Sequence, residues 1–218
     1  MIKIAPSVLG ADFSKLGEEI QSVDNAGADW YHLDIMDGHF VPNISFGPAV
    51  VKTVDKLSKK YLDVHLMLSE PEKYFEAFVK AGADAVTFHI EVHRNPTKHL
   101  QNLKNMGVHA GLSLNPDAKA EMVLPYLKDC NLLLVMSVFP GFGGQSFIES
   151  AMDTVAEARE YIDKHKLDCL ISVDGGVGPD NAQRVADAGA DVLVMGSAFF
   201  KAADRTKLVE QVHNIKRK

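Results

Sequence analysis

The chain has 218 residues, of which 46% are hydrophobic and 24% charged, and its formal net charge at pH 7 is −6. These values predict a globular protein with a substantial core, and the acidic balance argues against a general nucleic-acid binder while leaving room for a small anionic substrate. No apolar run reaches membrane-spanning length and no signal-peptide pattern follows Met1, so we expect no membrane partner and a cytoplasmic location. Cys130 and Cys169 match no metal or redox spacing, which also favours a reducing compartment.

The first half of the chain predicts four strands that alternate with four helices. Runs of apolar residues mark the strands, and apolar stripes at helical spacing mark the helices. Asp12 or Ser14 is a suitable cap for the first helix, and Gly27 is a suitable residue to end it. We expect strands at 2–9, 30–38, 62–67 and 85–89, and helices at about 13–26, 49–59, 70–81 and 96–105.

The second half continues the same alternation. The run 132–138 is almost wholly apolar, as is typical of a parallel strand that is buried on both faces. We expect strands at 109–114, 132–138, 170–173 and 192–195, and helices at about 120–127, 150–164, 181–188 and 205–216.

A short repeat supports this count of eight strand–helix units. The tetrapeptide Ala-Gly-Ala-Asp occurs at 26–29, 81–84 and 188–191, each time between a helix and a strand. The intervals between copies contain two and four predicted units, so one unit has about 27 residues and eight units account for the whole chain. The sequence therefore predicts a single (β/α)8 TIM barrel domain over 1–218, with a doubly wound open sheet as the alternative fold.

Four residues at predicted strand ends form a candidate metal site. On a strand, His32, Asp34 and Met36 share one face, and polar residues there need a compensating partner. A buried His–Asp hydrogen bond would explain His32 and Asp34 alone, and His65 or Asp174 alone would fit a packing or turn role. Together at the carboxyl ends of barrel strands, the two histidines and two aspartates favour a site for Zn²⁺, Fe²⁺, Mn²⁺ or Co²⁺.

Glycines and methionines extend this candidate site. Glycine lets backbone N–H groups approach an anion, so glycines in three successive strand-end loops favour a phosphate cradle. Three methionines fall on inner faces near strand ends, where each alone is a gap filler and all together would form a water-poor wall. The loop glycines are Gly141, Gly143, Gly144, Gly175, Gly176, Gly178 and Gly196, the last followed by Ser197, and the methionines are Met36, Met67 and Met136.

The remaining polar residues of these segments are weaker candidates. His89 ends a predicted strand and could reach the pocket, but we favour a surface or packing role for it. Asp37 is expected to form hydrogen bonds with the loop that follows it.

On these residues the sequence resembles the ribulose-phosphate 3-epimerase family over essentially its whole length. The second of the matching stretches is very specific, and the others are moderately so. They are 4–7 (Ile-Ala-Pro-Ser), 32–43 (His-Leu-Asp-Ile-Met-Asp-Gly-His-Phe-Val-Pro-Asn), 63–67 (Asp-Val-His-Leu-Met), 140–145 (Pro-Gly-Phe-Gly-Gly-Gln) and 173–177 (Val-Asp-Gly-Gly-Val).

The resemblance implies a barrel enzyme of the pentose phosphate pathway that interconverts D-ribulose 5-phosphate and D-xylulose 5-phosphate. It implies one divalent metal ion per subunit and a homo-oligomer. The implied metal ligands are His32, Asp34, His65 and Asp174, with Asp34 and Asp174 also acting as the acid/base pair. The implied substrate contacts are Ser7, His65, Gly141, Phe142, Gly143, Gly144, Asp174, Gly175, Gly176, Gly196 and Ser197.

The chemistry of an epimerase suits this set of residues. Inversion at a carbon next to a ketone needs a proton removed from one face and returned to the other, which two carboxylates accomplish through an enediolate. A metal ion would stabilise that enediolate as a Lewis acid, and the loop around Phe142 would close over the substrate.

Two departures from the family pattern leave the substrate open. Phe139 stands where the family commonly has Asn, and Asp117-Ala118 follows Asn115-Pro116 where Thr-Pro is usual. A related ketohexose-phosphate (allulose 6-phosphate) 3-epimerase is therefore the nearest alternative. A metal-free phosphate-binding barrel, such as a synthase or a sugar-phosphate sensor, would need the glycine loops without the His/Asp residues. A purely structural protein would not explain carboxylates on inner strand faces.

Overall fold

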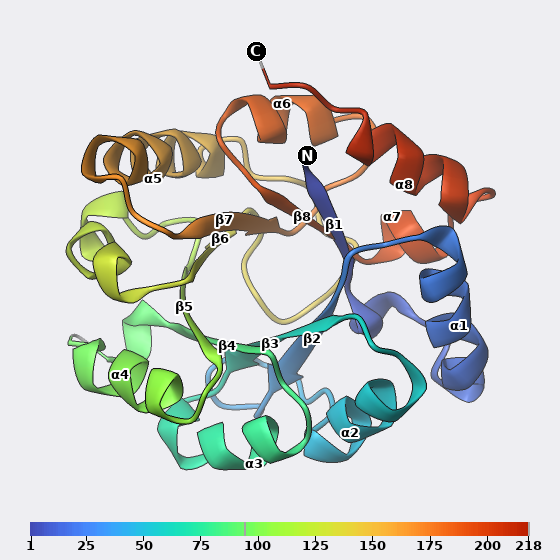
Figure 1. Ribbon diagram of the computed structural model, residues 1–218, viewed down its shortest axis with the longest axis horizontal. Coiled ribbons are helices and arrows are strands. Elements are labelled where there is room, and N and C mark those ends of the chain that lie inside the picture. The colour runs from blue at the N-terminus through green and yellow to red at the C-terminus, as the bar shows by residue number, and fades with distance from the viewer. Residues whose placement is uncertain (94, 218) are drawn as a thin grey trace.

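The computed structural model describes residues 1–93 and 95–217. Its eight parallel strands form one sheet in the order β1-β8-β7-β6-β5-β4-β3-β2. A parallel bridge between Ser7 and His32 brings the two ends of this sheet together. The strands thus surround a central axis and the helices form an outer ring (Figure 1). The predicted (β/α)8 TIM barrel is confirmed, and the open doubly wound sheet is wrong.

Most of the predicted elements are present, with small changes at their ends. The strands are β1 (Lys3–Pro6), β2 (Trp30–Met36), β3 (Tyr61–Met67), β4 (Ala85–His89), β5 (His109–Leu114), β6 (Leu132–Met136), β7 (Leu170–Asp174) and β8 (Val192–Met195). The α-helices are α1 (Leu16–Ala26), α2 (Pro48–Leu57), α3 (Phe75–Lys80), α4 (Thr97–Asn105), α5 (Ala151–His165), α6 (Ala182–Asp187), α7 (Ser197–Phe200) and α8 (Arg205–His213).

Three predicted elements differ from the structure where proline intervenes. The first strand ends at Pro6 instead of residue 9, because proline lacks the N–H that a strand ladder needs. The helix predicted at 120–127 is a pair of 3₁₀ segments, Ala120–Met122 and Leu124–Asp129, with Pro125 in the first turn of the second. The helix predicted from residue 70 likewise begins as a 3₁₀ turn, Pro71–Lys73, before α3 starts.

The strand predictions at 30–38 and 132–138 extend two residues too far, and the short helix α7 was not predicted. Both strands stop at a methionine that faces the pocket. The residues after them turn away into loops, and these loops build the rim of the site.

The Ala-Gly-Ala-Asp repeat ties neighbouring strands together at their amino ends. Each glycine has a positive φ, between +83° and +125°, and ends a helix or helical turn. Each aspartate then accepts a hydrogen bond from the first residues of the preceding strand: Asp29 from Ile4 N–H, Asp84 from Leu62 N–H and Asp191 from Ile171 N–H, at 2.8–2.9 Å. Asn131 does the same for Ala110 N–H. The even-numbered strands are therefore each pinned to the odd-numbered strand before them.

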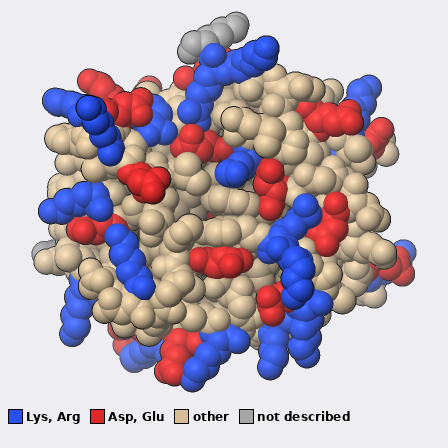
Figure 2. Space-filling model, in the orientation of Figure 1, with Lys and Arg blue, Asp and Glu red and all other residues tan. Residues whose placement is uncertain are grey.

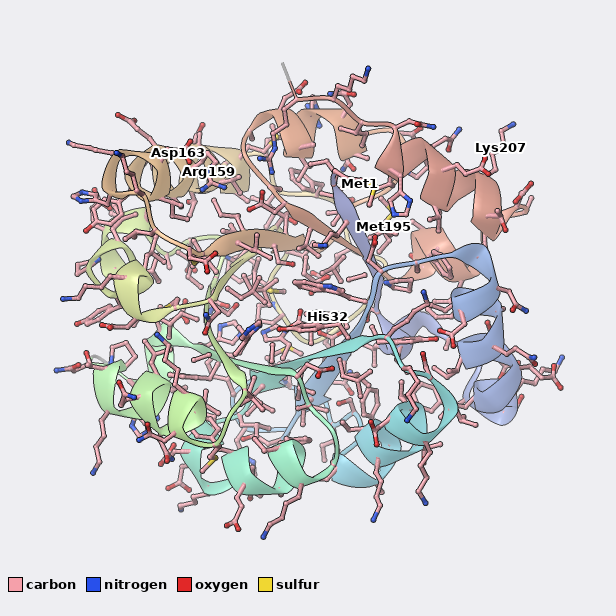
Figure 3. All side chains as sticks on the ribbon, viewed as in Figure 1. Met1, His32, Arg159, Asp163, Met195 and Lys207 are labelled. Atoms are coloured by element: carbon pink, nitrogen blue, oxygen red, sulfur yellow. The ribbon has the colours of Figure 1, made fainter. Side chains whose placement is uncertain are left out.

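The core has an outer and an inner part. Outward-facing strand residues, such as Leu33 and Ile171, pack against the apolar stripes of the helices. Inside the barrel, a smaller apolar cluster that includes Trp30 and Leu132 fills the amino end. His32 lies well inside the ring, whereas Arg159 and Asp163 lie on the outer helix α5 (Figure 3).

The outer surface carries charges of both signs. On the face shown in Figure 2, Lys/Arg and Asp/Glu side chains intermingle around the rim, where the helices lie. Among the residues that the structure describes, none of the helices combines the length and apolarity needed to cross a bilayer.

Candidate active site

A pocket of about 370 Å³ opens at the carboxyl ends of the strands. Loops after β1, β6, β7 and β8 form most of its wall. Every residue predicted to contact the substrate lines it except His65, and so do the three predicted methionines. The lining residues are Ser7, Leu9, Gly10, Asp34, Met36, Met67, Met136, Val138, Pro140, Gly141, Phe142, Gly143, Gly144, Gln145, Asp174, Gly175, Gly176, Val177, Gly178, Pro179, Asp180, Val194, Gly196, Ser197 and Ala198.

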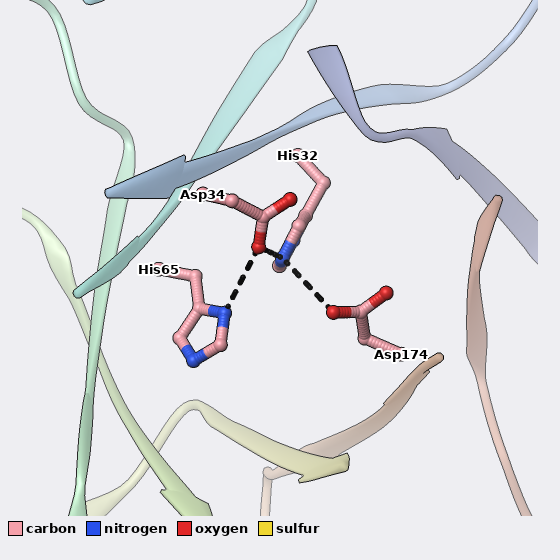
Figure 4. Close-up of side chains that lie close together, drawn as sticks. All are labelled: His32, Asp34, His65 and Asp174. Carbon is pink, nitrogen blue, oxygen red and sulfur yellow. Dashed lines mark hydrogen bonds and ion pairs between the residues drawn. The ribbon is translucent and has the colours of Figure 1, made fainter. Parts of the chain in front are cut away.

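The four predicted metal ligands meet at the floor of this pocket. His32 and Asp34 come from β2, His65 from β3 and Asp174 from the end of β7. One potential ligand atom from each lies within 4.8 Å of all the others. Figure 4 shows the four side chains converging on one small space. The chain thus presents two imidazole nitrogens and two carboxylate oxygens together, a donor set that suits several divalent ions.

His32 has a nitrogen that fits a cation better than any neighbouring group. Its ring is fully buried, and Nδ1 lies 2.8 Å from Oδ2 of Asp63. A carboxylate accepts hydrogen bonds, so Nδ1 carries the proton and Nε2 presents a lone pair. Nε2 is 3.2 Å from Oδ1 of Asp34 and 4.0 Å from Oδ2 of Asp174, yet it has no hydrogen-bond partner among the described residues. A bound divalent ion would compensate this buried, unpaired nitrogen.

His65 occupies the next strand and is equally buried. Its Nδ1 lies 3.2 Å from Oδ1 of Asp34, and its Nε2 lies 2.8 Å from Nε2 of His89. His89 is fully buried, so the surface role considered for it is wrong, and besides packing against its neighbours it contacts a predicted metal ligand. Asp63 was also missed, although its position two residues before His65 places it on the same inner face.

The pKa values of the two carboxyl groups are displaced in opposite directions. Burial alone would raise the pKa of Asp34, but the neighbouring His32 and His65 hold it well below its usual range. Burial and the charge of Asp34 raise the pKa of Asp174 to about 7. The two carboxyl groups thus differ in their affinity for a proton, which suits an acid and base pair.

The two histidines also differ. Burial lowers the pKa of His65 to about 4. Burial acts in the same direction on His32, but the neighbouring Asp34 and Asp63 outweigh it and raise the pKa of His32. The pKa values differ because two carboxylates neighbour His32, whereas burial is the dominant influence on His65.

Two loops on the β2 side hold the cluster in place. Ser7 donates its hydroxyl to Oδ2 of Asp34 at 2.5 Å, and Asp34 is only 4% exposed. Asp37, as predicted, bonds the following loop: its carboxylate accepts from the N–H groups of His39 and Phe40, and also from Ser69.

Glycines shape the opposite side of the pocket. Gly175 and Gly176 have φ of +117° and +63°, and a Cβ on Gly176 would lie 2.7 Å from the backbone nitrogen of Phe147. Gln145 donates from Nε2 to the carbonyl oxygens of Phe139 and Phe142, which ties the loop after β6 to itself. The side chain of Phe142 is 56% exposed at the pocket mouth. The backbone therefore forms much of this wall.

An eight-stranded barrel with two imidazoles and two carboxylates beneath a glycine-rich pocket defines the chain as a barrel enzyme with a candidate metal site. Residues 3–200 match the model of the ribulose-phosphate 3 epimerase family. The chain belongs to this family, and it is an isomerase of the epimerase type.

Relatives with names of this family match the chain over almost its full length. The chain is 49% identical to the ribulose-phosphate 3-epimerase of Synechocystis sp., covering 99% of this chain and 95% of the relative. It is 46% identical to the ribulose-phosphate 3-epimerase of Bacillus subtilis, covering 99% and 100%. It is 44% identical to the chloroplastic ribulose-5-phosphate-3-epimerase of Arabidopsis thaliana, covering 99% and 78%.

Solved structures with little sequence identity share the fold. A 3-hexulose-6-phosphate synthase from Salmonella typhimurium matches with a TM-score of 0.72 and 17% identity over 98% of both chains. KGPDC from Streptococcus mutans also matches with a TM-score of 0.72, at 11% identity over 99% of both chains. At such identities the likeness concerns the barrel alone.

Proposed function

We propose that this protein interconverts D-ribulose 5-phosphate and D-xylulose 5-phosphate by two-base proton transfer at C3 through an enediolate. The observation that carries the proposal is the convergence of the Asp34 and Asp174 carboxyl groups on one space, with a ligand atom of each within 4.8 Å of the other. The opposite displacements of their pKa values are consistent with it. The relatives named as ribulose-phosphate 3-epimerases support the choice of substrate.

The mechanism uses one carboxyl group for each face of the reacting carbon. Asp34, ionised and held by the Ser7 hydroxyl, removes the C3 proton from one face. Asp174, whose pKa is raised to about 7 by burial and by Asp34, returns a proton to the other face. In the reverse direction the two residues exchange roles. The substrate itself does not have to turn over in the pocket.

A divalent ion fits the same floor. We assign His32 Nε2, Asp34, His65 Nδ1 and Asp174 as its ligands, with one Zn²⁺, Fe²⁺, Mn²⁺ or Co²⁺ per subunit. When bound, the ion would supply Lewis-acid stabilisation of the negative charge that develops on the carbonyl oxygen of the sugar. The two histidines help to exclude water from the floor of the pocket, since both are fully buried.

The remaining pocket residues hold the substrate. The backbone of 141–144, 175–176 and 196–197 surrounds the phosphate group, which lies away from the reacting carbon and keeps the sugar in register. Met36, Met67 and Met136 form the apolar wall beside the carboxyl groups. The protein acts in the cytoplasm as a homo-oligomer.

The test is an epimerase assay with ribulose 5-phosphate and with allulose 6-phosphate, using enzyme stripped of metal and then reconstituted. We expect the pentose phosphate to be epimerised, activity to be lost on stripping, and one of the four ions to restore it. Preference for allulose 6-phosphate would move the assignment to the hexose phosphate enzyme. Full activity after verified removal of metal would overturn the metal-dependent mechanism.

A further inference from the structure

We infer that His89 and Glu91 are positioning residues that fix the tautomer of His65 and present its Nδ1 lone pair to the metal ion. The inference rests on the metal site proposed above and extends it beyond the four ligands. Neither residue lines the pocket, so neither one meets the substrate. Their effect passes through His65 alone.

The three side chains form a continuous line of hydrogen-bond contacts. His65 Nε2 lies 2.8 Å from His89 Nε2, and the two rings stack with centroids 5.0 Å apart. His89 Nδ1 lies 3.2 Å from Oε2 of Glu91. The other oxygen of Glu91 accepts the backbone N–H of Asn115 at 2.7 Å. The line therefore starts at the metal cluster and ends at a backbone group just after β5.

Counting protons along this line assigns each nitrogen. Two ring nitrogens at 2.8 Å share a single proton, because two protons would clash and two lone pairs would repel. If His65 Nε2 carries that proton, His89 Nε2 accepts it, and His89 Nδ1 donates its own proton to Glu91. Both rings are then neutral, and His65 Nδ1 has a lone pair facing Asp34 and the metal position.

The opposite placement of the shared proton, on His89 Nε2, is unfavourable both at Glu91 and at His65. If His89 Nε2 carried the shared proton, neutral His89 would turn an Nδ1 lone pair towards the carboxylate of Glu91. His65 would then carry its proton on Nδ1, where a metal ion needs a lone pair. Glu91 therefore selects the tautomer that binds metal.

The surroundings leave these rings little freedom. His89 is fully buried, and the ring of Phe40 packs on it with centroids 4.6 Å apart. His32 offers an internal comparison, because its Nδ1 meets the carboxylate of Asp63 directly. Both metal-binding histidines are thus oriented by a carboxylate: His32 directly, and His65 through the imidazole of His89.

The experiment measures metal affinity and tautomer, without relying on turnover. The dissociation constant for Zn²⁺ is measured by competition with a chromophoric chelator for the unchanged chain and for E91Q, H89F and H89Q. The matched control is E72Q, because Glu72 contacts His93 at 3.0 Å in a similar pair whose hydrogen bonds do not reach the cluster. Circular dichroism checks that each variant is folded. If H89F does not fold, the Zn²⁺ affinity of E91Q still tests the inference, because glutamine has the same shape as glutamate.

We expect Zn²⁺ affinity to fall about 10-fold in E91Q and about 100-fold in H89F, the range found when partners of metal-binding histidines are removed. H89Q keeps an oxygen that can accept from His65, so it should recover part of the loss. E72Q should stay within about 2-fold of the unchanged chain, since its histidine binds no metal. In the Zn²⁺-loaded chain, ¹⁵N NMR should show neutral His65 protonated at Nε2.

The results separate the two proposals. Unchanged Zn²⁺ affinity in both E91Q and H89F, or a loaded His65 protonated at Nδ1, would overturn the role of His89 and Glu91 and leave the metal site standing. If the unchanged chain itself binds none of the four ions, the metal site is wrong and this role falls with it.

Discussion

The two sides of the pocket differ in what forms them: polar side chains on one side, and mainly loop backbone on the other. The side formed by β2, β3 and β4 places fully buried imidazoles and carboxylates at the floor, each held by a hydrogen bond to another side chain. On the other side, β6 and β8 have apolar inner faces, with residues such as Leu134 and Val194, and the rim consists of glycine-rich loops. Asp174, at the end of β7, is the one of the four candidate ligands on this second side, and its side chain is 17% exposed.

This difference teaches where residue identity matters. On the β2–β4 side, function depends on particular side-chain atoms, because a lone pair or a carboxylate oxygen must lie within a few ångströms of its partner. On the β6–β8 side, function depends on the course of the backbone, which glycine permits and most other residues would distort. Asp174 apart, substitutions should therefore have large effects on the first side and effects limited to special backbone positions on the second.

The largest effect is expected from D34N and D174N, which remove one base from each face of the substrate. Each variant should lose C3 proton exchange by roughly 10²- to 10⁴-fold, the usual contribution of a positioned acid or base. Incorporation of deuterium from solvent into ribulose 5-phosphate measures this directly. D180N is the control, because Asp180 lines the same pocket outside the cluster. Near-normal exchange in either variant would remove that carboxylate from the mechanism.

A smaller effect is expected on stability when metal binds the β2–β4 side. Zn²⁺ at 100 times its dissociation constant should stabilise the fold by about 2.7 kcal/mol, because only the folded chain assembles the site. For a chain of this size that raises the melting temperature by roughly 5–10 °C. Thermal denaturation with and without Zn²⁺ measures the shift, and a chelator should reverse it. An equal shift in the H32A variant would place the bound ion elsewhere, since His32 Nε2 is the unpaired nitrogen that we assign to the metal ion.

The β6–β8 side is tested by comparing two glycines of one turn. A Cβ on Gly176 would lie 2.7 Å from a backbone nitrogen at a φ of +63°, whereas a Cβ on Gly178 would meet only a side-chain carbon of Ala198 at 3.5 Å. The left-handed conformation costs other residues about 1–2 kcal/mol. We expect G176A to raise KM for the sugar phosphate about 10-fold, equivalent to about 1.4 kcal/mol. G178A should leave steady-state kinetics unchanged, and equal effects of the two substitutions would contradict the backbone argument.

The same contrast explains what the sequence alone predicts. Strand alternation places His32 and Asp34 on one face, and the position of His65 and Asp174 at strand ends brings them to the same floor. The pairing of His32 with Asp63 follows from the register between β2 and β3, which local patterns do not contain. The contact of His89 with His65 is not contained in local patterns for the same reason, since its partner lies on the neighbouring strand β3.

Helical segments were mistaken where local chemistry outweighed periodicity. The stretch 120–129 has apolar residues at helical spacing, yet it folds as 3₁₀ turns around Pro125. The helix α7 has only four residues, too short to produce a periodic pattern. In the sequence, the Ala-Gly-Ala-Asp repeat indicates the number of strand–helix units. Only the structure shows that its aspartates also form hydrogen bonds between strands.

The smallest effect is expected from F139N, a substitution on the β6–β8 side towards the residue common in the family. Phe139 does not line the pocket, its side chain is 51% exposed, and its carbonyl oxygen accepts the hydrogen bond from Gln145. Any residue supplies that carbonyl, so kcat/KM for ribulose 5-phosphate should change by less than about 2-fold, as for surface substitutions generally. The ratio of pentose to hexose phosphate activity should also stay constant. A marked change in that ratio would mean that this loop reads the substrate with side chains, which would remove the distinction between the two sides of the pocket.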